Sequence, residues 1–294
     1  MQSHDEDILK RVRRIEIKTR GLSDEIFAGK YHTAFRGRGM SFAEVREYRV
    51  GDDVRDIDWN VTARSDRAHV KVYEEERELT MMLLVDVSPS RMFGSEELTK
   101  KNLITEVAAT LAFSASKNND KVGCILFSDH IEKFIPPKKG RSHILMIIRE
   151  LVSFKPSGKG TNISEALRYL VGVNKKRTTS FLLSDLVNSV EDMPKFEDAL
   201  KIASSKHDLM AIHIFDKRDR ELPDVGIIEM EDSESGAVQW VDSSSRRVRD
   251  FWQRSYEERT AKMSRMLTHN RVDVAEVSTD GDYVVELIKM FKTR

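Results

Sequence analysis

Short apolar segments that alternate with longer amphipathic ones, from Leu79 onward, are the feature that most constrains the fold of this chain. The apolar segments have the length of buried strands. They are residues 79–85, 122–127, 131–135, 180–183, 208–215 and 272–277. The helical segments are residues 99–117, 142–152, 163–173, 194–204, 246–267 and 282–291, and residues 226–240 are expected to form a β-hairpin with its turn at 233–236. Continuous apolar strands separated by helices predict an α/β fold, in which helices cover both faces of a mostly parallel central sheet.

The first 78 residues have a different character from the rest. An amphipathic helix is expected over about residues 5–20, packed on the main domain or, as the alternative, lying on a membrane surface. Residues 31–78 are dense in charge and interrupted by glycine, which predicts irregular structure and short strands, the last at 69–73. Because this segment is too polar for a core of its own, residues 1–78 are predicted to pack on a main domain of residues 79–294.

Charge and composition exclude several classes of protein. Basic and acidic residues number 49 each, so the formal net charge is zero and a nucleic-acid partner is not expected. No apolar stretch approaches the roughly 18 residues of a membrane-spanning helix, and the amino terminus lacks the features of a signal peptide. The expected location is the cytoplasm, with a peripheral position at the inner membrane as the alternative. The single cysteine, Cys124, lies in an apolar segment and is expected to be a buried thiol.

Three polar motifs follow the predicted strands at the points where a ligand site is expected. Asp86, Ser88 and Ser90 come directly after the first central strand. Thr161 lies in a glycine-rich turn that opens a predicted helix, and Asp185 follows the strand at 180–183. Ligands of open α/β sheets bind at the carboxyl ends of the strands, so these five side chains are expected to lie together. Each motif alone is ordinary, because Asp, Ser and Thr are common in turns and helix caps.

These residue types suit a magnesium site. Mg²⁺ takes about six oxygen ligands in octahedral geometry and keeps some of its water. Neutral hydroxyls of Ser88, Ser90 and Thr161 can bind the ion directly without cancelling its charge, while Asp86 and Asp185 hold it through water. The ion then keeps an open position for a carboxylate from another protein. The residues therefore predict a site for Mg²⁺ or Mn²⁺ that captures an acidic side chain.

Other functions for the same residues are weaker but stay open. Residues 158–161, Gly-Lys-Gly-Thr, lack the spacing of a Walker phosphate loop. A phosphatase with a nucleophilic Asp86 would need an acid where Ser88 stands. A magnesium-dependent hydrolase would need a general base, for which Asp129 and Glu165 are the convenient candidates. A scaffold that binds no metal is a further alternative.

The order Asp-x-Ser-x-Ser, then Thr, then Asp resembles the metal-ion-dependent adhesion site of von Willebrand factor A-like domains. Upstream, the sequence reads Arg-Glu-Tyr at residues 46–48, Gly-Asp-Asp at 51–53, Ile-Asp-Trp at 57–59 and Ala-Arg at 63–64. This string is similar to the signature of the bacterial domain-of-unknown-function 58 family. With the metal motif behind it, the resemblance covers most of the chain.

The resemblance implies a von Willebrand factor A-like (Rossmann-like) fold and a MoxR-type AAA+ ATPase as partner. Such pairs are thought to act like chaperones in assembling or activating complexes. Many relatives carry membrane-spanning helices ahead of the signature, and none is expected here. The function expected is a non-enzymatic binding module. The charged residues of the signature then either form an ion-pair network around Trp59 or present a docking face, with Arg55 and Trp59 as its anchors.

Overall fold

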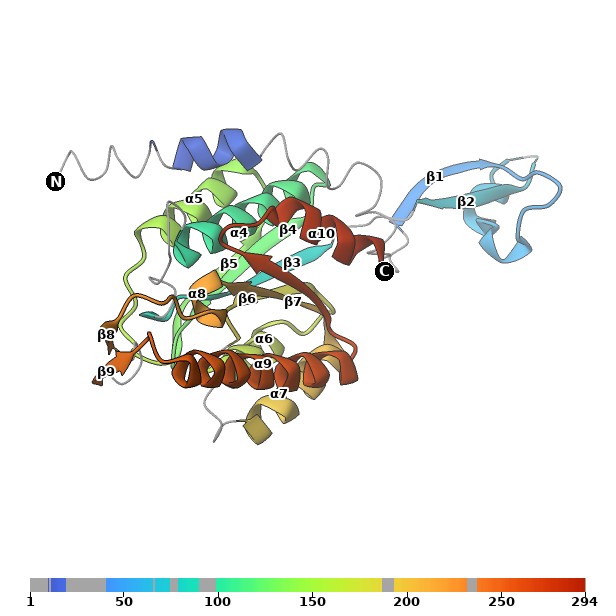
Figure 1. Ribbon diagram of the computed structural model, residues 1–294. Helices are drawn as coiled ribbons and strands as arrows, with labels where there is room; N and C mark the ends of the chain where they lie inside the picture. Colours follow the sequence, from blue (N-terminus) through green and yellow to red (C-terminus); the bar gives the residue numbers. More distant parts are fainter. Residues whose placement is uncertain are drawn as a thin grey trace. The chain divides into compact units, whose positions relative to one another are not determined.

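The computed structural model describes residues 10, 12–19, 41–65, 67–74, 79–89, 99–186, 193–231 and 237–293 (Figure 1). The chain forms two compact units, of which the smaller is Phe35–Leu79 and the larger combines Met1–Ala34 with Thr80–Arg294. The N-terminal helix thus groups with the larger unit, whereas the division made from the sequence assigned it to the first part, residues 1–78. None of the helices in the described part of the chain combines the length and apolar character that crossing a bilayer requires.

A six-stranded sheet is the centre of the larger unit. Its strands are β3 (Thr80–Asp86), β4 (Lys121–Phe127), β5 (Ile131–Lys138), β6 (Thr179–Ser184), β7 (Asp208–Phe215) and β10 (Asp273–Ser278). They lie in the order β10-β7-β6-β3-β4-β5. All neighbouring pairs are parallel except β4 and β5, which are joined by a turn too short for a parallel crossover. The mostly parallel sheet predicted from the apolar segments is confirmed.

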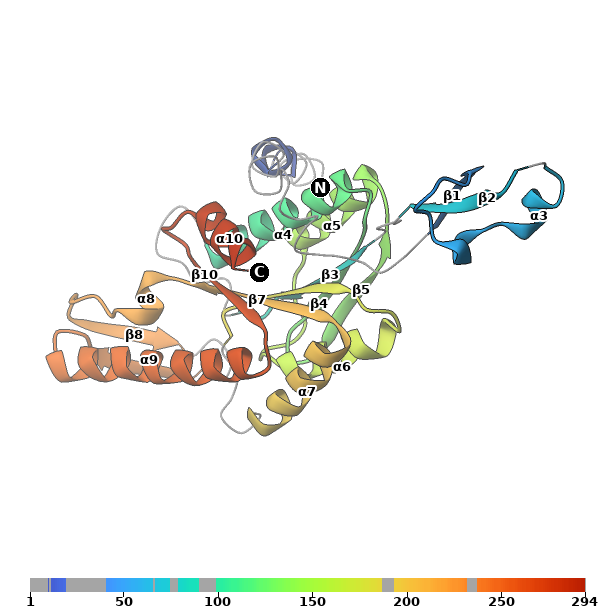
Figure 2. The same cartoon turned by 90° about the vertical axis from the view of Figure 1, so that its right-hand side faces the viewer.

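Helices cover both faces of this sheet, as predicted. One face carries α4 (Lys100–Lys117), α5 (Arg141–Ser153) and α10 (Tyr283–Lys292), and the other α6 (Ile163–Val173), α7 (Met193–Lys206) and α9 (Arg246–His269), as Figures 1 and 2 show. Between β7 and α9 the chain forms the short helix α8 (Lys217–Arg220) and the antiparallel strands β8 (Ile227–Glu231) and β9 (Val238–Asp242). These strands confirm the predicted hairpin, while its predicted turn lies outside the described residues. The predicted α/β fold class, with a mostly parallel sheet covered by helices on both faces, is confirmed.

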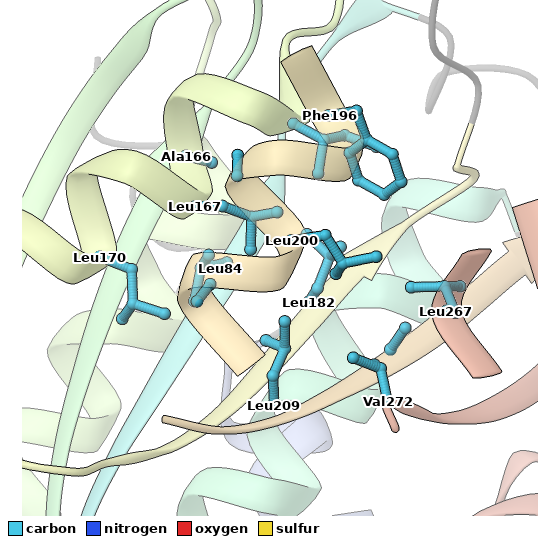
Figure 3. Close-up of a cluster of buried hydrophobic side chains, with 14 of the residues drawn as sticks. Leu84, Ala166, Leu167, Leu170, Leu182, Phe196, Leu200, Leu209, Leu267 and Val272 are labelled. Carbon is cyan, nitrogen blue, oxygen red and sulfur yellow. The ribbon is translucent and has the colours of Figure 1, made fainter. Parts of the chain in front are cut away.

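The core follows from the periodicities in the sequence. Strand β3 is buried along almost its whole length, as a central parallel strand must be. On the face covered by α6, α7 and α9, strand residues such as Leu84 and Leu182 meet helix residues such as Leu167 and Phe196, all fully buried (Figure 3). In α6 the buried residues recur at helical spacing, which leaves its other side for solvent. Cys124 is a buried free thiol, as expected.

The order of the strands places a crevice at one point of the sheet. From β3 the chain crosses through α4 to β4 on one side, and from β6 it crosses through α7 to β7 on the other side. The direction of winding therefore reverses between the neighbouring strands β3 and β6. In doubly wound sheets, ligands bind outside the carboxyl ends of the strands at this reversal. Asp86 ends β3 and Asp185 directly follows β6.

The N-terminal helix, described over residues 12–19, packs on the larger unit. Val12 and Thr19 are buried, and Glu16 accepts an ion pair of 2.6 Å from Arg141 at the start of α5. Lys18 pairs with Glu106 of α4 at 2.6 Å. The predicted amphipathic helix is confirmed over these residues, and the rest of the predicted range lies outside them apart from Lys10.

The smaller unit is built on an antiparallel pair, β1 (Ser41–Glu47) and β2 (His69–Glu74), with a 3₁₀ turn η1 (Val54–Asp56) and a short helix α3 (Trp59–Thr62) between them. Acidic side chains of the charged segment serve as caps. Asp53 accepts a hydrogen bond at the start of η1, and Asp58 accepts two at the start of α3. Arg46 and Asp52 form a bidentate pair with two bonds of 2.7 Å. The predicted irregular segment with short strands is confirmed over residues 41–65 and 67–74, and the rest of the predicted range 31–78 lies outside the described residues.

Candidate metal centre at the carboxyl edge of the sheet

Asp86 is a buried carboxylate at the reversal point of the sheet. It is 2% exposed, and its two oxygens accept hydrogen bonds from the Ser88 backbone N–H at 2.9 Å and the Ser184 hydroxyl at 2.7 Å. Burial, together with the negative charge of Asp185, raises the pKa of Asp86 to about 6. The ionised carboxylate is therefore unfavourable in this environment, and a nearby cation would stabilise it.

Asp185 lies beside Asp86, because its strand β6 pairs directly with β3. Lys100, the first residue of α4, reaches this edge with a buried side chain and places its ammonium 3.4 Å from Asp185 Oδ2. The same ammonium lies 2.7 Å from Asp219 Oδ2 of α8. Although burial opposes its charge, Asp185 and Asp219 together raise the pKa of Lys100 above its ordinary value. Among the described residues, Lys100 thus links Asp219 to the pair Asp185 and Asp86.

Thr161 supplies the strongest sign of an unfilled ligand position. Its hydroxyl oxygen is buried and has no hydrogen-bond partner among the described residues, a property it shares with the Ser164 hydroxyl. Buried polar atoms in proteins are nearly always paired, so each unpaired one needs an explanation. Asn162, the next residue, ties the loop to the end of β4 through a hydrogen bond of 2.7 Å from its N–H to the Ser128 carbonyl. Strand β4 is the neighbour of β3, so Thr161 is held on the Asp86 side of the sheet edge.

Two carboxylates hold the loop that carries Thr161. Glu132 Oε1 accepts hydrogen bonds of 2.8 Å from the backbone N–H groups of Ser157 and Gly158 and from the Ser128 hydroxyl. Burial opposes the charge, but these bonds keep the pKa of Glu132 below its ordinary value. Asp129 accepts a further bond of 3.1 Å from the Lys159 N–H. The loop 157–160 is therefore clamped to the turn between β4 and β5.

Substituting Gly158 by alanine is expected to weaken divalent metal binding about tenfold, because the clamp positions Thr161. A Cβ at Gly158 would lie 2.2 Å from both Asp129 Oδ1 and Ser128 Oγ, so the loop must shift. Gly160→Ala is the matched control, since its Cβ would meet only Asp129 Cβ at 3.7 Å, an ordinary contact. Calorimetric titration of both variants with Mn²⁺ measures the difference. Equal affinities in the two variants would contradict a role of the clamp.

The structure brings together most of the residues predicted for the metal site. Asp86, Ser88 and Asp185 share one network of contacts, and Thr161 lies at the adjoining strand end. Ser90 lies outside the described residues. Within the part of the chain that the structure describes, no three His, Cys, Asp or Glu side chains gather into a group that could hold a metal. A metal here would rest on two carboxylates and on hydroxyls, a donor set that suits a hard cation such as Mg²⁺.

Arg55 and Trp59, the tentative partner-binding residues, belong to the smaller unit. Arg55 is exposed in η1, and Trp59 is 68% exposed at the start of α3. Among the described residues, Arg46 of the signature pairs with Asp52, and Asp58 pairs with Lys71 of β2. These pairs agree with an ion-pair network in the segment, and a docking role of Arg55 and Trp59 stays a prediction.

The two candidate general bases of the hydrolase alternative differ in their surroundings. Asp129 bonds to His130 and to the loop backbone, and these hydrogen bonds lower the pKa of Asp129 below its ordinary value. Glu165 is exposed on the first turn of α6, where its N–H is capped by Asn162.

Three residues near the site were missed by sequence reasoning: Lys100, Glu132 and Asp219. The only local signal for Lys100 is the Thr99 cap, which marks a helix start next to it. Nothing in the sequence pairs Lys100 with acids 85 or more positions away, because that pairing depends on how α4 and α8 meet at the sheet edge.

Comparison with known proteins gives matches over most of the chain. A family model described as "Protein of unknown function DUF58" matches residues 44–262. Uncharacterised proteins of Mycobacterium bovis and Mycobacterium tuberculosis are each 28% identical over 285 residues, which is 96% of this chain and 88% of theirs. Among solved structures, the conserved hypothetical protein BatB of Bacteroides thetaiotaomicron is 16% identical, with a TM-score of 0.48 over 73% of this chain and 99% of that one. An aerotolerance-related membrane protein of Bacteroides fragilis is also 16% identical, with a TM-score of 0.45 over 74% and 100%.

Proposed function

The chain belongs to the DUF58 family, and on that premise we propose that it is a non-enzymatic binding protein that captures an acidic side chain of a partner through a Mg²⁺ or Mn²⁺ ion. The proposed ligands are the hydroxyls of Ser88, Ser90 and Thr161, with Asp86 and Asp185 acting through water. The von Willebrand factor A-like fold suits a protein-interaction module and presents its carboxyl edge as the binding surface.

The observation that carries the proposal is the buried Thr161 hydroxyl, which has no hydrogen-bond partner among the described residues, in a loop tied to the end of β4, the strand next to β3 and its buried Asp86. An unpaired buried hydroxyl typically destabilises a fold by about 1–3 kcal/mol. The raised pKa of Asp86 also indicates that hydrogen bonds do not fully offset the unfavourable burial of its negative charge. One bound cation would relieve both, because it accepts the lone pair of the hydroxyl and neutralises the carboxylates.

Each residue has a distinct part in partner capture. A divalent ion held by these residues would supply an electron-poor position for a carboxylate oxygen of the partner. Ser88 and Thr161 leave the positive charge of the site intact because they are neutral. Asp86 is oriented by Ser184 and by the Ser88 N–H, so its carboxylate holds ordered water without rotating. The clamp at Glu132 holds the Thr161 loop against the end of β4 and the start of β5.

Binding is favoured over hydrolysis by the surroundings of the candidate bases. A general base near neutral pH works best when its pKa lies close to the operating pH. Hydrogen bonds move the pKa of Asp129 in the opposite direction. Glu165 is exposed to water, which does not activate a carboxylate as a base.

We propose a MoxR-type AAA+ ATPase as the partner that supplies the work, with Arg55 and Trp59 as anchors of a docking face. Exposed Trp and Arg side chains are the residue types that most often dominate binding energy. Trp59 is exposed although it is large and apolar, which favours a contact surface over a core role.

Co-purification of the full chain with a MoxR-type ATPase encoded beside it tests the proposal. The ATPase is expected to co-elute in Mg²⁺ and to be lost in EDTA and with Asp86→Asn or Asp185→Asn. Loss of co-elution in Mg²⁺ with Trp59→Ala would assign a second contact with the ATPase to the docking face. Co-elution that persists unchanged in EDTA and in both aspartate variants would overturn metal-dependent capture.

A further inference from the structure

Lys100 is an unusual neighbour for a metal ligand. Its side chain is 5% exposed, and its ammonium lies 3.4 Å from Asp185 Oδ2, a carboxylate proposed to hold the divalent ion. An ammonium in this place already neutralises part of the negative charge that would attract a metal. The ion and the lysine therefore compete for Asp185.

Asp219 gives this ammonium a second acceptor at a fixed position. Its Oδ2 lies 2.7 Å from Lys100 Nζ and also accepts the Asp216 N–H at 2.8 Å, in the capping box of α8. The Asp219 carbonyl accepts a hydrogen bond of 3.0 Å from Trp252 Nε1 of α9. Asp219 is thus held from two sides. Its distance to the Lys100 ammonium is shorter than that of Asp185.

We propose that Lys100 is a built-in competitor of the divalent ion, which holds Asp185 when no metal is bound and moves wholly onto Asp219 when metal binds. This inference rests on the proposed metal site and concerns its regulation. Lys100 keeps the metal-free site folded by pairing its carboxylates, and it lowers the affinity of the site for metal. The fraction of sites that hold metal then depends on whether the Lys100 ammonium pairs with Asp185 or with Asp219.

The charges set the direction of every effect. An ammonium and a divalent cation that share one carboxylate repel each other even at an effective dielectric constant of about 20. After screening by water and rearrangement of the side chains, we expect this repulsion to lower metal affinity by roughly 100-fold. Removing the lysine charge removes the repulsion, whereas removing the charge of Asp219 weakens its hold on Lys100 and favours the contact of Lys100 with Asp185. The two changes should therefore shift metal affinity in opposite directions.

Calorimetric titration of the full chain with Mn²⁺ tests the inference. Lys100→Met is expected to bind Mn²⁺ roughly 10- to 100-fold more tightly than the wild type, and to melt at a lower temperature in EDTA but not in saturating Mn²⁺. Lys100→Arg keeps the charge and is the matched control, expected to bind within about threefold of the wild type. Asp219→Asn, at a position 23% exposed, keeps the inference testable if Lys100→Met does not fold. It is expected to bind roughly tenfold more weakly.

The outcomes separate this inference from the proposed function. Tighter binding in Lys100→Met with weaker binding in Asp219→Asn supports competition. Binding by Lys100→Met alone, with none in the wild type, supports it as well, because the lysine then blocks the site. Equal Mn²⁺ affinity in wild type, Lys100→Met and Asp219→Asn would overturn the inference and leave the metal site standing. Absence of binding in every variant would overturn both.

Discussion

Asp86→Asn is expected to weaken Mn²⁺ binding roughly 1000-fold or more while the chain stays folded. At about 4 Å and an effective dielectric constant of about 20, a divalent ion and one carboxylate attract by about 8 kcal/mol, of which water and rearrangement offset a large part. The amide keeps the size of the side chain: its oxygen can accept the hydrogen bond from the Ser88 N–H, and its NH2 can donate to the Ser184 hydroxyl oxygen. Calorimetry with Mn²⁺ measures the loss directly.

A buried aspartate outside the site provides the control. Asp120 is 2% exposed and precedes β4 at the amino edge of the sheet, opposite the proposed site. Asp120→Asn should leave the Mn²⁺ affinity unchanged even if it lowers stability. A wild-type affinity in Asp86→Asn, or an equal loss in Asp120→Asn, would show that metal binding does not depend on this carboxylate.

The contribution of Asp86 to the stability of the metal-free protein should fall as the pH rises from about 4 to about 6. The pKa of Asp86 is raised from 3.8 to about 6 in the folded state, so between these values the folded chain binds more protons than the unfolded one. Stability then decreases with rising pH, by up to about 3 kcal/mol for this group, and is level above the folded pKa. Urea unfolding in EDTA at several pH values measures the slope.

Asp86→Asn isolates the contribution of this one group. The asparagine does not titrate, so the difference in unfolding free energy between variant and wild type should grow from about pH 4 to about pH 6 in favour of the variant. Groups that titrate in both proteins, such as His130, cancel in this difference. Saturating Mn²⁺ should reverse the order, because it stabilises only the ionised wild type. A difference that does not change with pH would refute the assignment.

Much of the fold was predictable because it depends on local periodicity. Strand β3 is a continuous apolar run since both of its faces are covered, and α6 repeats its buried residues at helical spacing. The antiparallel orientation of β5 could also be inferred afterwards from the short turn that joins it to β4. The grouping of the N-terminal helix with the larger unit depends instead on contacts such as Glu16 with Arg141, which no local pattern reveals.

The candidate site divides in the same way. Asp86 and Asp185 were found because each follows an apolar strand, and parallel strands end at one edge. Glu132 was missed because it lies within the edge strand β5, where it reads as an ordinary polar position. Its function as a clamp requires the backbone of Ser157 and Gly158, which reaches it only after α5 has returned the chain to this edge.

The α/β architecture, the motif of Asp86, Ser88 and Ser90, and the order in which Thr161 and Asp185 follow it could all be predicted from the sequence. They depend on apolar periodicity and on position at strand ends, which are local properties of the chain. The contact of Lys100 with Asp185 and Asp219, and the burial of the Thr161 hydroxyl with no hydrogen-bond partner among the described residues, required the three-dimensional structure. These facts depend on burial and on distances between elements far apart in the chain, and burial is what makes each charge and each unpaired hydroxyl matter energetically.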